Sequence, residues 1–570
     1  MSFRVKHWQV APAISSEIIA RFAEQQFNPI LVQVLYNRGI TTQAEADRFL
    51  KTEAIPGNPF ELRGMTLAVD RLRHAIRAGE KIAVYGDFDV DGVTATALLV
   101  QTLQALGAKV TPYIPHRIDE GYGLNREAMT NLKEQGTRVV VTVDSGIRSL
   151  EEIAFGNSIG LDMIVTDHHA PGATMPDAFA VINPKQKDCP YPYKELSGSG
   201  VAFKVAQALL RTEAQVLTAQ QPVEISEDDL LDLVALGTVA DLVPLTGENR
   251  ALVRRGLERL RKTERPGIQA MLRYAALKAE AISAGKIGYT LGPRLNAAGR
   301  LEHALDAYHL LTTLYPAEAD ALAQKLENTN HTRQRMTIDL TLKAQNIVNS
   351  HAATDHLLFV ADPEFLEGIV GLIASRLSEE FYRPAIVVHQ GAEESRGSAR
   401  SISEFNMVSA LDECRDLLVR HGGHAMAAGF TVRSENIPAL QARLQQIAAR
   451  VLAGNEIAPS VFVDAEVRLS EMGWDVQKSL AQLEPFGYGN REPVFVSRNA
   501  KVRDVRVVGN GHLKLLLSDG QIVWDAIAFR QGDWASKMPK QIDVVYELDA
   551  SVWNGKERLQ LNVKDLKPSE

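Results

Sequence analysis

The sequence predicts an α/β protein with two domains in which strands alternate with helices, a long helix between them, and a small β-barrel at the C-terminal end. Three observations predict this class. From Lys81 onward, apolar runs alternate with amphipathic runs, as in a mostly parallel sheet covered by helices. The polar-faced stretch from Pro316 to Asn349 has the length and period of one extended helix. From about residue 456, short alternating strands are separated by Gly-Asn and Asp-Gly turns.

The elements follow from the local pattern. Residues 1–55 are expected to form short helices, and residues 201–304 are mainly helical. The first α/β segment places strands at 81–86, 109–114, 138–144, 161–167 and 178–183, with helices at 93–106, 126–135 and near 151. Gly107 and Gly136 stand where two of these helices should end. A second α/β segment runs from 355 to about 451, and residues 455–460 are expected to form a linker.

Composition limits the class of protein. A chain of 570 residues is too long for one hydrophobic core, so three or four domains are expected. The net charge of −8 excludes a protein coated with basic charge but leaves room for a local basic groove. The two cysteines, Cys189 and Cys414, fit a reducing compartment and form no zinc pattern. No signal peptide and no bilayer-length apolar run is present, so a cytoplasmic location is expected.

Acidic and histidine side chains follow the ends of predicted strands and of one helix. They are Asp87, Asp89 and Asp91 after the first strand, Asp144 after the third, Asp167, His168 and His169 after the fourth, and Asp241 at the end of a helical run. In an open parallel sheet, ligands bind beyond the carboxyl ends of the strands. These side chains are therefore expected to converge on one crevice.

So many carboxylates in one crevice would repel one another and raise each other's pKa values. Divalent cations resolve this conflict, and oxygen ligands with one imidazole suit Mg²⁺ or Mn²⁺. A pair of such ions can activate water and stabilise the leaving oxygen of a phosphoryl displacement. Each aspartate alone could be a helix N-cap or a turn residue, and the His-His pair could be unrelated to metal. The joint arrangement favours a metal site.

Four segments, DFDVDG, VDSG, TDHH and ALGTVAD, resemble the successive motifs of the DHH phosphoesterase superfamily. RHGGHAMAAGF (420–430) resembles the Gly-Gly-His motif of the associated DHHA1 domain. LGPRLNAAGRLEHA (291–304) and LEPFGYGNREPVF (483–495) are similar to segments of the RecJ-type exonucleases in this superfamily. The resemblance implies a DHH catalytic domain at 56–315, a connector helix at 316–350, a DHHA1 substrate-binding domain at 351–455 and an OB-fold-like nucleic-acid-binding domain at 456–570. An N-terminal helical segment, 1–55, precedes them.

The resemblance also implies an activity. It is that of a single-stranded-DNA-specific 5′-to-3′ exonuclease, which releases mononucleotides with two Mn²⁺ or Mg²⁺ ions and acts in DNA repair and recombination. The implied partners are single-stranded DNA with a 5′ end, a helicase and a single-strand-binding protein, and no membrane. One alternative is an oligonucleotide or cyclic-dinucleotide phosphodiesterase, against which the C-terminal β-rich domain argues. The other is a catalytically inactive DNA-binding scaffold, against which the intact ligand set argues.

Residue roles are carried over from the family motifs. Asp89 and Asp144 match ligands of one ion, and Asp144 would bridge to a second ion whose other ligands are Asp91, His168 and Asp241. Asp167 and His169 would orient the ligands or face the substrate, and Asp87 would support them.

The sequence departs from the family motifs at two positions. Tyr85 stands where some superfamily members have a histidine ligand, which implies a weaker first metal site. Phe365-Leu366-Glu367-Gly368 stands where RecJ-type chains often have Trp-His-x-Gly, so a histidine contact is missing there. Gly368 and Gly371 are expected to preserve the backbone turn.

The family implies a 5′-phosphate pocket formed by Ser398 and Arg400 of RGSARS, closed by Arg117; planar arginine donors suit such a group. Arg396 is expected to be solvated. Arg294 and Arg300 could bind backbone phosphates or form salt bridges. His421, Gly422, Gly423 and His424 are expected to form a tight turn, either an anion-binding nest with His424 on the substrate or a capped glycine turn.

Further residues could contact a single strand. Tyr122 could stack on a base, although a core position is favoured. In the barrel, Phe486 and Tyr488 are candidate stacking residues, and Lys501, Arg503, Arg506 and Lys514 are candidate phosphate contacts. Fold analogy is the main argument for these barrel residues, and a solvated face of a barrel strand is the alternative.

Overall fold

The computed structural model describes residues 6–22, 27–51, 57–117, 119–121, 123–216, 225–350, 356–454, 457–553 and 556–569. The chain forms two compact units. One unit, Pro56–Ile457, contains both α/β segments. The other combines Met1–Ile55 with Ala458–Glu570, so the two ends of the chain share a unit.

The first sheet has the strand order β3-β2-β4-β5-β6, and all its pairings are parallel. Its strands are β2 (Lys81–Tyr85), β3 (Lys109–Tyr113), β4 (Thr137–Val143), β5 (Asp162–Thr166) and β6 (Ala180–Ile182). The order reverses at β2, because β3 pairs with one edge of β2 and β4 with the other. Such a reversal opens a crevice at the carboxyl ends of the strands. Residues that follow β2 and β4 are therefore brought together.

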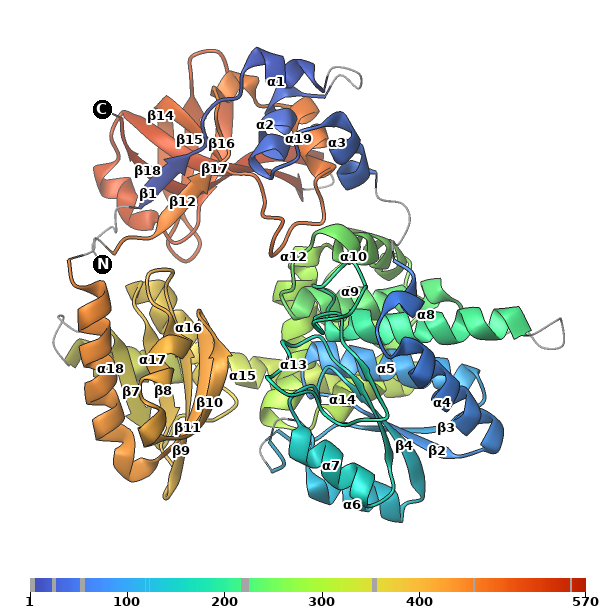
Figure 1. The fold of residues 1–570 in the computed structure, drawn as a ribbon. Helices are drawn as coiled ribbons and strands as arrows, with labels where there is room; N and C mark the ends of the chain where they lie inside the picture. The colour runs from blue at the N-terminus through green and yellow to red at the C-terminus, as the bar shows by residue number, and fades with distance from the viewer. Residues whose placement is uncertain are drawn as a thin grey trace. The chain divides into compact units, whose positions relative to one another are not determined.

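Helices cover both faces of this sheet (Figure 1). On one face, α6 (Arg126–Glu134) and α7 (Leu150–Ser158) pack Met129 and Ile153 against Tyr85 and Val140. On the other lie α4 (Met65–Ala78), α5 (Val90–Ala105) and α8 (Gly198–Val216). Valine and isoleucine dominate the strands, as expected where a parallel sheet is buried on both faces.

Helices complete this segment and lead out of it. They are α9 (Leu231–Ala240), α10 (Gly247–Leu260), α11 (Pro266–Tyr274), α12 (Ala284–Lys286), α13 (Gly292–Leu301) and α14 (Leu305–Thr312), with a π-helical turn at Ile287–Leu291 between α12 and α13. The predicted long helix is α15 (Pro316–Ser350). It packs against α11, α13 and α14, and farther along against the second α/β segment. It therefore connects the two segments within one unit.

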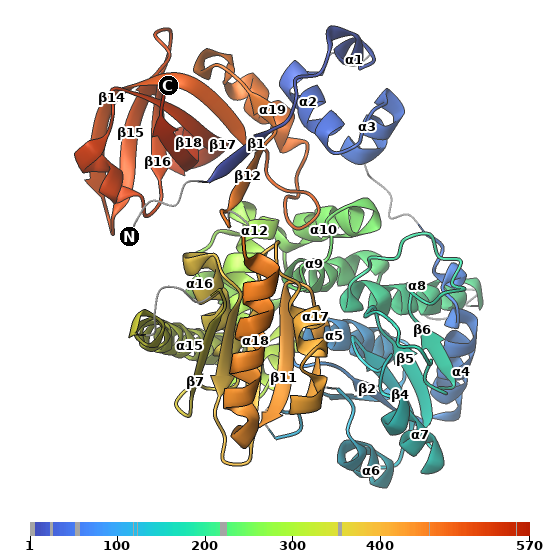
Figure 2. The same cartoon turned by 60° about the vertical axis from the view of Figure 1, so that its left-hand side comes forward.

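The second sheet has the order β10-β11-β9-β8-β7. Its strands are β7 (Leu358–Asp362), β8 (Ala385–His389), β9 (Glu394–Arg400), β10 (Leu418–His424) and β11 (Ala427–Arg433). Only the β7–β8 pairing in this sheet is parallel among the described residues. One face is covered by α16 (Val370–Phe381) and the end of α15, and the other by α17 (Met407–Asp412) and α18 (Ile437–Leu452), as Figure 2 shows.

The prediction of a tight turn at His421–His424 is wrong. These residues belong to β10 and pair with β11, with Gly422 opposite Gly429 and Gly423 opposite Ala428. A Cβ at Gly423 would lie 2.6 Å from Ala428 Cα, so the glycine permits a close strand pairing here. The backbone N–H groups consequently face a strand partner or the edge of the sheet, and they do not form a nest.

The C-terminal segment is a closed barrel, as predicted. Its sheet has the order β13-β14-β15-β16-β18-β17, and β17 also pairs with β14. The strands are β12 (Ser460–Val463), outside the barrel, and β13 (Ala465–Glu466), β14 (Phe495–Val508), β15 (His512–Ser518), β16 (Val523–Ala528), β17 (Gln541–Trp553) and β18 (Lys556–Pro568). The short helix α19 (Trp474–Ala481) precedes β14.

The N-terminal residues belong to the barrel unit, and the expectation of helices alone there is wrong. The first element is the strand β1 (His7–Val10), which pairs in parallel with β12. It is followed by α1 (Ser16–Ala20), α2 (Pro29–Asn37) and α3 (Gln43–Leu50). Leu31 and Leu35 of α2 share one buried core with Leu513 and Leu515 of β15. The blue N-terminal helices accordingly lie beside the barrel in Figure 1.

Leu35→Ala is expected to lower the free energy of unfolding of the barrel unit by about 2–5 kcal/mol, because Leu35 is fully buried in the shared core. Tryptophan fluorescence during urea unfolding reports this unit alone, since every tryptophan lies in it: Trp8, Trp474, Trp524, Trp534 and Trp553. Leu98→Ala, in the core of the other unit, is the matched control and should leave the fluorescence transition unchanged. An unchanged midpoint for Leu35→Ala would show that α2 does not stabilise the barrel.

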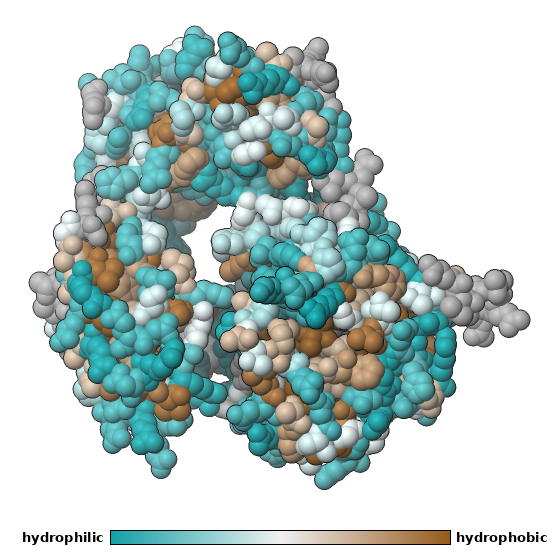
Figure 3. Space-filling view, in the orientation of Figure 1, coloured by the Kyte–Doolittle hydropathy of each residue, from teal (hydrophilic) through white to brown (hydrophobic). Residues whose placement is uncertain are grey.

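In the part of the chain that the structure describes, no helix combines the length and apolarity needed to cross a membrane. The face drawn in Figure 3 is largely hydrophilic, with separate hydrophobic areas between the hydrophilic ones.

Candidate metal centre and arginine pocket

The loop after β2 places three aspartates at the start of α5. Asp89 is the N-cap of α5, and its Oδ1 accepts a hydrogen bond from Gly92 N at 3.0 Å. Asp91, 1% exposed, accepts hydrogen bonds from Gly198 N at 2.6 Å and Ser199 N at 2.9 Å. Asp87 is buried beside them. The capping role expected as an alternative for an aspartate here is thus real for Asp89, and it leaves that carboxylate beside the others.

The next acidic groups come from β4, β5 and α9. Asp144 follows β4 with a backbone φ of 59°, a left-handed conformation that is uncommon for a residue with a side chain. His168 follows β5, and its Nε2 lies 3.1 Å from Asp144 Oδ1 and 3.5 Å from Asp241 Oδ2. Asp241 is the C-cap of α9. The structure therefore brings Asp241 close to Asp91, which stands 150 residues earlier in the sequence.

These side chains form three overlapping groups, each with ligand atoms within 4.8 Å of one another. The groups are Asp87, Asp89 and Asp144; Asp91, His168 and Asp241; and Asp144, Asp167, His168 and His169. Every predicted metal ligand belongs to a group. Asp87, expected only as a supporting residue, lies with Asp89 and Asp144, and so is itself placed as a candidate ligand.

The polar atoms of these groups fit a cation. Among the described residues, buried atoms without a hydrogen-bond partner include Asp87 Oδ1, Asp144 Oδ1, Asp241 Oδ2 and both ring nitrogens of His168. A buried polar atom that lacks a partner is destabilising. Carboxylate oxygens with one imidazole are a donor set for Mg²⁺ or Mn²⁺. These four residues can therefore bind such ions through atoms that make no hydrogen bond.

Burial and mutual repulsion strongly raise the pKa values of several acids in this centre. Burial, and then the neighbouring Asp89, raise the pKa of Asp87 to about 8. Burial, with Asp91 and Asp89 beside it, raises the pKa of Asp241 to about 9, and the pKa of Asp144 is raised well above its usual range for the same reasons. Burial lowers the pKa of His168 to about 3, so its imidazole is neutral, as a metal ligand must be.

Asp167 orients the two histidines. Its Oδ1 accepts hydrogen bonds from His168 N at 2.7 Å and His169 N at 3.0 Å, and lies 2.7 Å from His169 Nδ1. Its Oδ2 accepts from Ile147 N at 2.9 Å. Burial opposes ionisation of Asp167, but these bonds outweigh it and lower the pKa of Asp167. For His169, burial is likewise outweighed by Asp167, which raises the pKa of the imidazole.

Tyr85 is a core residue. Its side chain is fully buried, its ring packs 4.8 Å from that of Tyr113, and its hydroxyl donates to Gly123 O at 3.1 Å. Tyr85 also shares a hydrophobic cluster with Met129 of α6. Its hydroxyl is therefore engaged on the α6 side of the sheet, and Tyr85 does not replace a histidine ligand.

The stability of the metal-free protein is expected to fall as the pH rises from about 4, where an unfolded aspartate ionises, to about 9. Asp91, Asp87 and Asp241 have raised pKa values of about 6, 8 and 9 in the folded protein, so each loses its stabilising contribution between the pKa of the unfolded chain and its own folded pKa. Thermal melting with and without Mg²⁺ tests this, because a bound cation should remove the decline. Asp241→Asn, which cannot ionise, should flatten the slope without metal. Equal slopes with and without Mg²⁺ would contradict the assignment.

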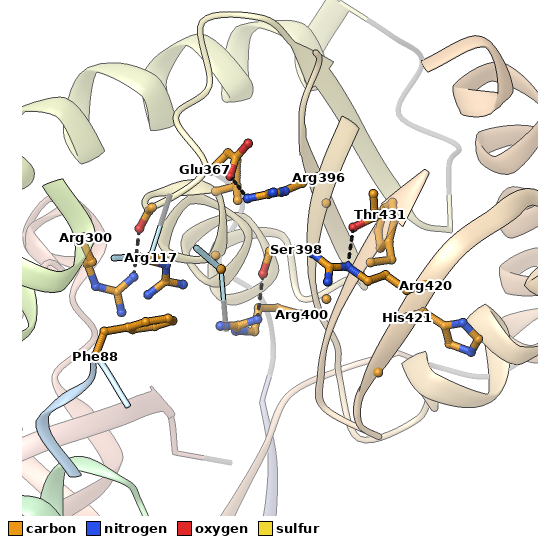
Figure 4. Close-up of a pocket in the computed structure, with 18 residues that line it drawn as sticks. Phe88, Arg117, Arg300, Glu367, Arg396, Ser398, Arg400, Arg420, His421 and Thr431 are labelled. Carbon is orange, nitrogen blue, oxygen red and sulfur yellow. Dashed lines mark hydrogen bonds and ion pairs between the residues drawn. The ribbon is translucent and has the colours of Figure 1, made fainter. Parts of the chain in front are cut away.

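A cavity of about 500 Å³ lies between the two α/β segments of this unit, and arginines line it (Figure 4). They are Arg117 and Arg300 from the first segment and Arg396, Arg400 and Arg420 from the second. Phe88, which stands between Asp87 and Asp89 in the chain, forms part of the wall. The arginine pocket is therefore joined to the metal centre through a single residue.

The predicted pocket residues meet here. Arg117 stacks over the Phe88 ring at 4.7 Å, and Arg300 Nη1 donates to Gly368 O at 3.0 Å. Arg400 Nη1 donates to Ser398 Oγ at 3.2 Å. Burial, and then Arg117, lower the pKa of Arg300 to about 10, while burial alone lowers that of Arg400. Positive charge gathered in one cavity suits an anion with several acceptor atoms for charge-assisted hydrogen bonds.

The other residues considered as phosphate contacts have protein partners in the structure. Arg396, expected to be solvated, lines the pocket and pairs with Glu367 at 2.6 Å. Arg294 forms the salt-bridge alternative, with bonds of 2.6 and 3.0 Å to Glu327 of α15. His421 and Gly422 reach the pocket wall, and His421 Nε2 lies 2.9 Å from Asp412 Oδ1.

Sequence reasoning missed Phe88 and Arg420 as pocket residues, although each stands inside a quoted motif. Gly423 and His424 are not among the residues that line the pocket. Tyr122 lies outside the described residues.

In the barrel unit, some of the residues predicted to contact a single strand of nucleic acid are exposed, and others contact the protein itself. Tyr488 is 65% exposed, and Lys501, Arg503 and Arg506 are exposed along β14. Phe486 packs partly buried against the barrel core, and Lys514 pairs with Asp525 at 3.2 Å.

Models of three known families match the chain: DHH family, N-terminal domain, over residues 81–238; DHHA1 domain, over 355–450; and RecJ OB domain, over 463–565. The single-stranded-DNA-specific exonuclease RecJ of Bacillus subtilis is 39% identical over 570 residues, covering 99% of this chain and 71% of that protein. The RecJ of Escherichia coli K12 is 36% identical, covering 95% and 96%. The chain belongs to the RecJ family.

Solved structures of RecJ proteins share the fold. RecJ from Thermus thermophilus in complex with Mn²⁺ matches with a TM-score of 0.85 and 32% identity, covering 100% of this chain and 80% of that chain. Its complex with Mg²⁺ gives 0.79 and 30%, covering 99% and 79%. Both cations are ones that the donor atoms described above suit.

Proposed function

We propose that this RecJ-family protein is a single-stranded-DNA-specific 5′-to-3′ exonuclease that releases mononucleotides by phosphodiester hydrolysis with two Mn²⁺ or Mg²⁺ ions. One observation carries the proposal: Phe88 joins the arginine pocket directly to the neighbouring carboxylate groups. An anionic strand end in the pocket would place its first phosphodiester next to the metal centre. The names of the relatives support the same substrate and reaction.

In this proposal the pocket binds the 5′-phosphate. Ser398 and Arg400 of β9 supply a hydroxyl and a guanidinium that already contact each other, and Arg300 and Arg117 face them from the first segment. The Arg117 guanidinium lies over the Phe88 ring, which limits its freedom. Arginine suits this role because its planar donors match phosphate oxygens bidentately. His421 and Gly422 border the pocket, and Gly423 and His424 continue the same strand.

The carboxylate groups would hold the ions. Asp89 and Asp144, joined by Asp87, would bind one, and Asp91, His168 and Asp241, with Asp144 as the bridge, the other. Bound cations supply an acidified water and stabilise charge on the leaving oxygen. Asp167 holds both histidines in place, and His169 faces the substrate with its proton retained by Asp167. Asp144 belongs to the group with Asp87 and Asp89, and its Oδ1 lies 3.1 Å from Nε2 of His168 in the other group, so it is the residue on which the proposed reaction depends most.

The preference for single strands needs no base-specific contact, since stacking and phosphate contacts are sequence-independent. In the barrel unit we propose Tyr488, Lys501, Arg503 and Arg506 as strand contacts, because all four are exposed. A role in DNA repair and recombination and a cytoplasmic location follow from such a substrate. A helicase and a single-strand-binding protein are the proposed partners, since these proteins produce and cover single strands.

We also propose the functional division of the chain. The catalytic domain spans 56–315, the connector helix 316–350, the substrate-binding domain 351–455 and the nucleic-acid-binding domain 456–570. The positions of α15 and of the family matches support these limits. Residues 1–55 are assigned to the last of these domains, because β1 and α2 pack with the barrel.

The test offers the protein three substrates with Mn²⁺ or Mg²⁺: 5′-phosphorylated single-stranded DNA, blunt duplex DNA and a dinucleotide. Conversion of the single strand to mononucleotides, with the duplex intact, is the expected result. Cleavage of the dinucleotide alone would identify a small-substrate phosphodiesterase instead. Binding of single strands without cleavage of any substrate would identify a DNA-binding scaffold.

A further inference from the structure

The N-terminus of α8 contacts Asp91 and Asp144, which belong to different candidate metal groups. Gly198 and Ser199 begin this helix, and their backbone N–H groups donate to the two carboxylate oxygens of Asp91, at 2.6 and 2.9 Å. N–H groups in the first turn of a helix have no partner within the helix and carry partial positive charge. Each Asp91 oxygen keeps further lone pairs for a cation. The helix therefore fixes the orientation of Asp91 without using up its capacity as a ligand.

Gly198 also packs against Asp144. A Cβ at position 198 would lie 2.5 Å from Asp144 Cβ and Oδ1 and 2.6 Å from its Cγ, distances at which something must move. Asp144 is buried and its backbone already adopts a positive φ, so it has little room to yield. Only glycine allows α8 to begin in contact with Asp91 and Asp144 together. This residue thus sets the spacing between one ligand of each metal group.

Gly237 of α9 makes the third contact. A Cβ there would overlap Ser199 Oγ and Thr94 Oγ1 and lie 2.5 Å from Asp91 Oδ1. Gly237 stands one turn before Asp241, whose N–H donates to Gly237 O at 2.9 Å. Hydroxyl contacts also tie α8 to α9, since Ser197 Oγ lies 2.9 Å from Thr238 Oγ1. The close approach of α9 to α5 and α8 therefore brings Asp241 to Asp91 and His168.

We propose that Gly198, Ser199 and Gly237 are positioning residues that set the separation of the carboxylates and so allow two divalent cations to bind at the same time. The inference rests on the proposed two-ion function and adds the structural cause of the spacing. These residues would act through Asp91, Asp144 and Asp241, which they contact or carry. A larger residue at 198 would separate Asp91 from Asp144 and leave a site that holds one ion weakly.

Gly198→Ala tests the steric part, with Gly200→Ala as the matched control on the same helix. A Cβ at Gly200 would meet only ordinary contacts, the nearest at 3.4 Å. Mn²⁺ binding without DNA is measured by calorimetry, and the magnetic coupling between bound ions by electron paramagnetic resonance. Gly198→Ala should bind Mn²⁺ roughly 10–100-fold more weakly and lose the coupled two-ion signal, since supporting residues of metal ligands have effects of this size. Gly200→Ala should match the unmodified protein.

The backbone part is tested by Ser199→Pro and Ser199→Ala. Proline removes the N–H that holds Asp91 and is tolerated in the first turn of a helix, while alanine removes only the hydroxyl. Ser199→Pro should lose affinity as Gly198→Ala does, and Ser199→Ala should not. Thermal melting without metal shows whether Gly198→Ala folds. If it does not fold, the two Ser199 variants test the inference. Unchanged affinity and an unchanged coupled signal in the folded Gly198→Ala and Ser199→Pro variants would overturn the inference. Failure of the unmodified protein to bind Mn²⁺ would instead overturn the proposed function.

Discussion

Asp144→Asn is expected to reduce cleavage of single-stranded DNA by about 100-fold or more, because residues that only support metal ligands already account for 10–100-fold. Asp144 is the one acid shared by the group with Asp87 and Asp89 and the group with His168, among the described residues. Its Oδ1 is buried without a hydrogen-bond partner, and an asparagine keeps an oxygen of the same size for the contact with His168 Nε2 at 3.1 Å. The variant should therefore fold normally but lose most of its cleavage activity.

The measurement pairs the cleavage rate in Mn²⁺ with binding of a 5′-phosphorylated strand in the absence of divalent ions. Binding should persist, since Asp144 does not line the arginine pocket. Asp188→Asn is the matched control: it makes the same chemical change at a 74% exposed aspartate and should leave both quantities unchanged. Cleavage by Asp144→Asn at the rate of the control would refute the bridging role.

Arg400→Ala is expected to abolish the preference for a 5′-phosphate, weakening binding of phosphorylated strands roughly 10–100-fold, as expected for loss of hydrogen bonds between charged groups. Arg400 contacts Ser398 and has no acidic partner among the described residues that would hold it away from an anion. Strands with a 5′-hydroxyl should lose much less affinity, so the ratio between the two ends is the informative quantity.

Arg396→Ala is the matched control, because it removes the same group from the same strand four residues earlier. Arg396 is paired with Glu367, so its charge is already compensated and the loss should be small. Competition binding with 5′-phosphate and 5′-hydroxyl strands measures both variants. If Arg396→Ala removed the preference and Arg400→Ala kept it, the phosphate would lie at the Glu367 side of the pocket.

The metal centre was predictable because its position follows from topology. Acids at the carboxyl ends of parallel strands must meet at one edge of the sheet, and the reversal of strand order at β2 brings Asp89 and Asp144 there. The direction of each side chain was not predictable in the same way. Asp87 and Asp89 are two residues apart in a loop, and only the loop conformation places both beside Asp144.

The predictions from the sequence were wrong where the conformation of a residue depends on a partner that is distant in the sequence. The strand β1 pairs with β12, some 450 residues later, and nothing near Trp8 signals that pairing. Gly422 and Gly423 have the composition of a turn, but small residues opposite them in β11 make them a strand. Arg294 and Arg300 lie on one helix, and the choice between salt bridge and pocket depends on which face meets Glu327 of α15.

The direction of degradation tests the central claim most directly. A single strand labelled at its 5′-phosphate is mixed with the protein and Mn²⁺, and products are resolved during the first turnovers; a strand labelled at its 3′ end is treated in parallel. Binding of the 5′-phosphate beside the metal centre predicts that the 5′ label appears at once as a mononucleotide, while the 3′ label stays on a strand that shortens stepwise. A 5′ label that remains on progressively shorter strands, with mononucleotides released from the 3′ end, would contradict the account.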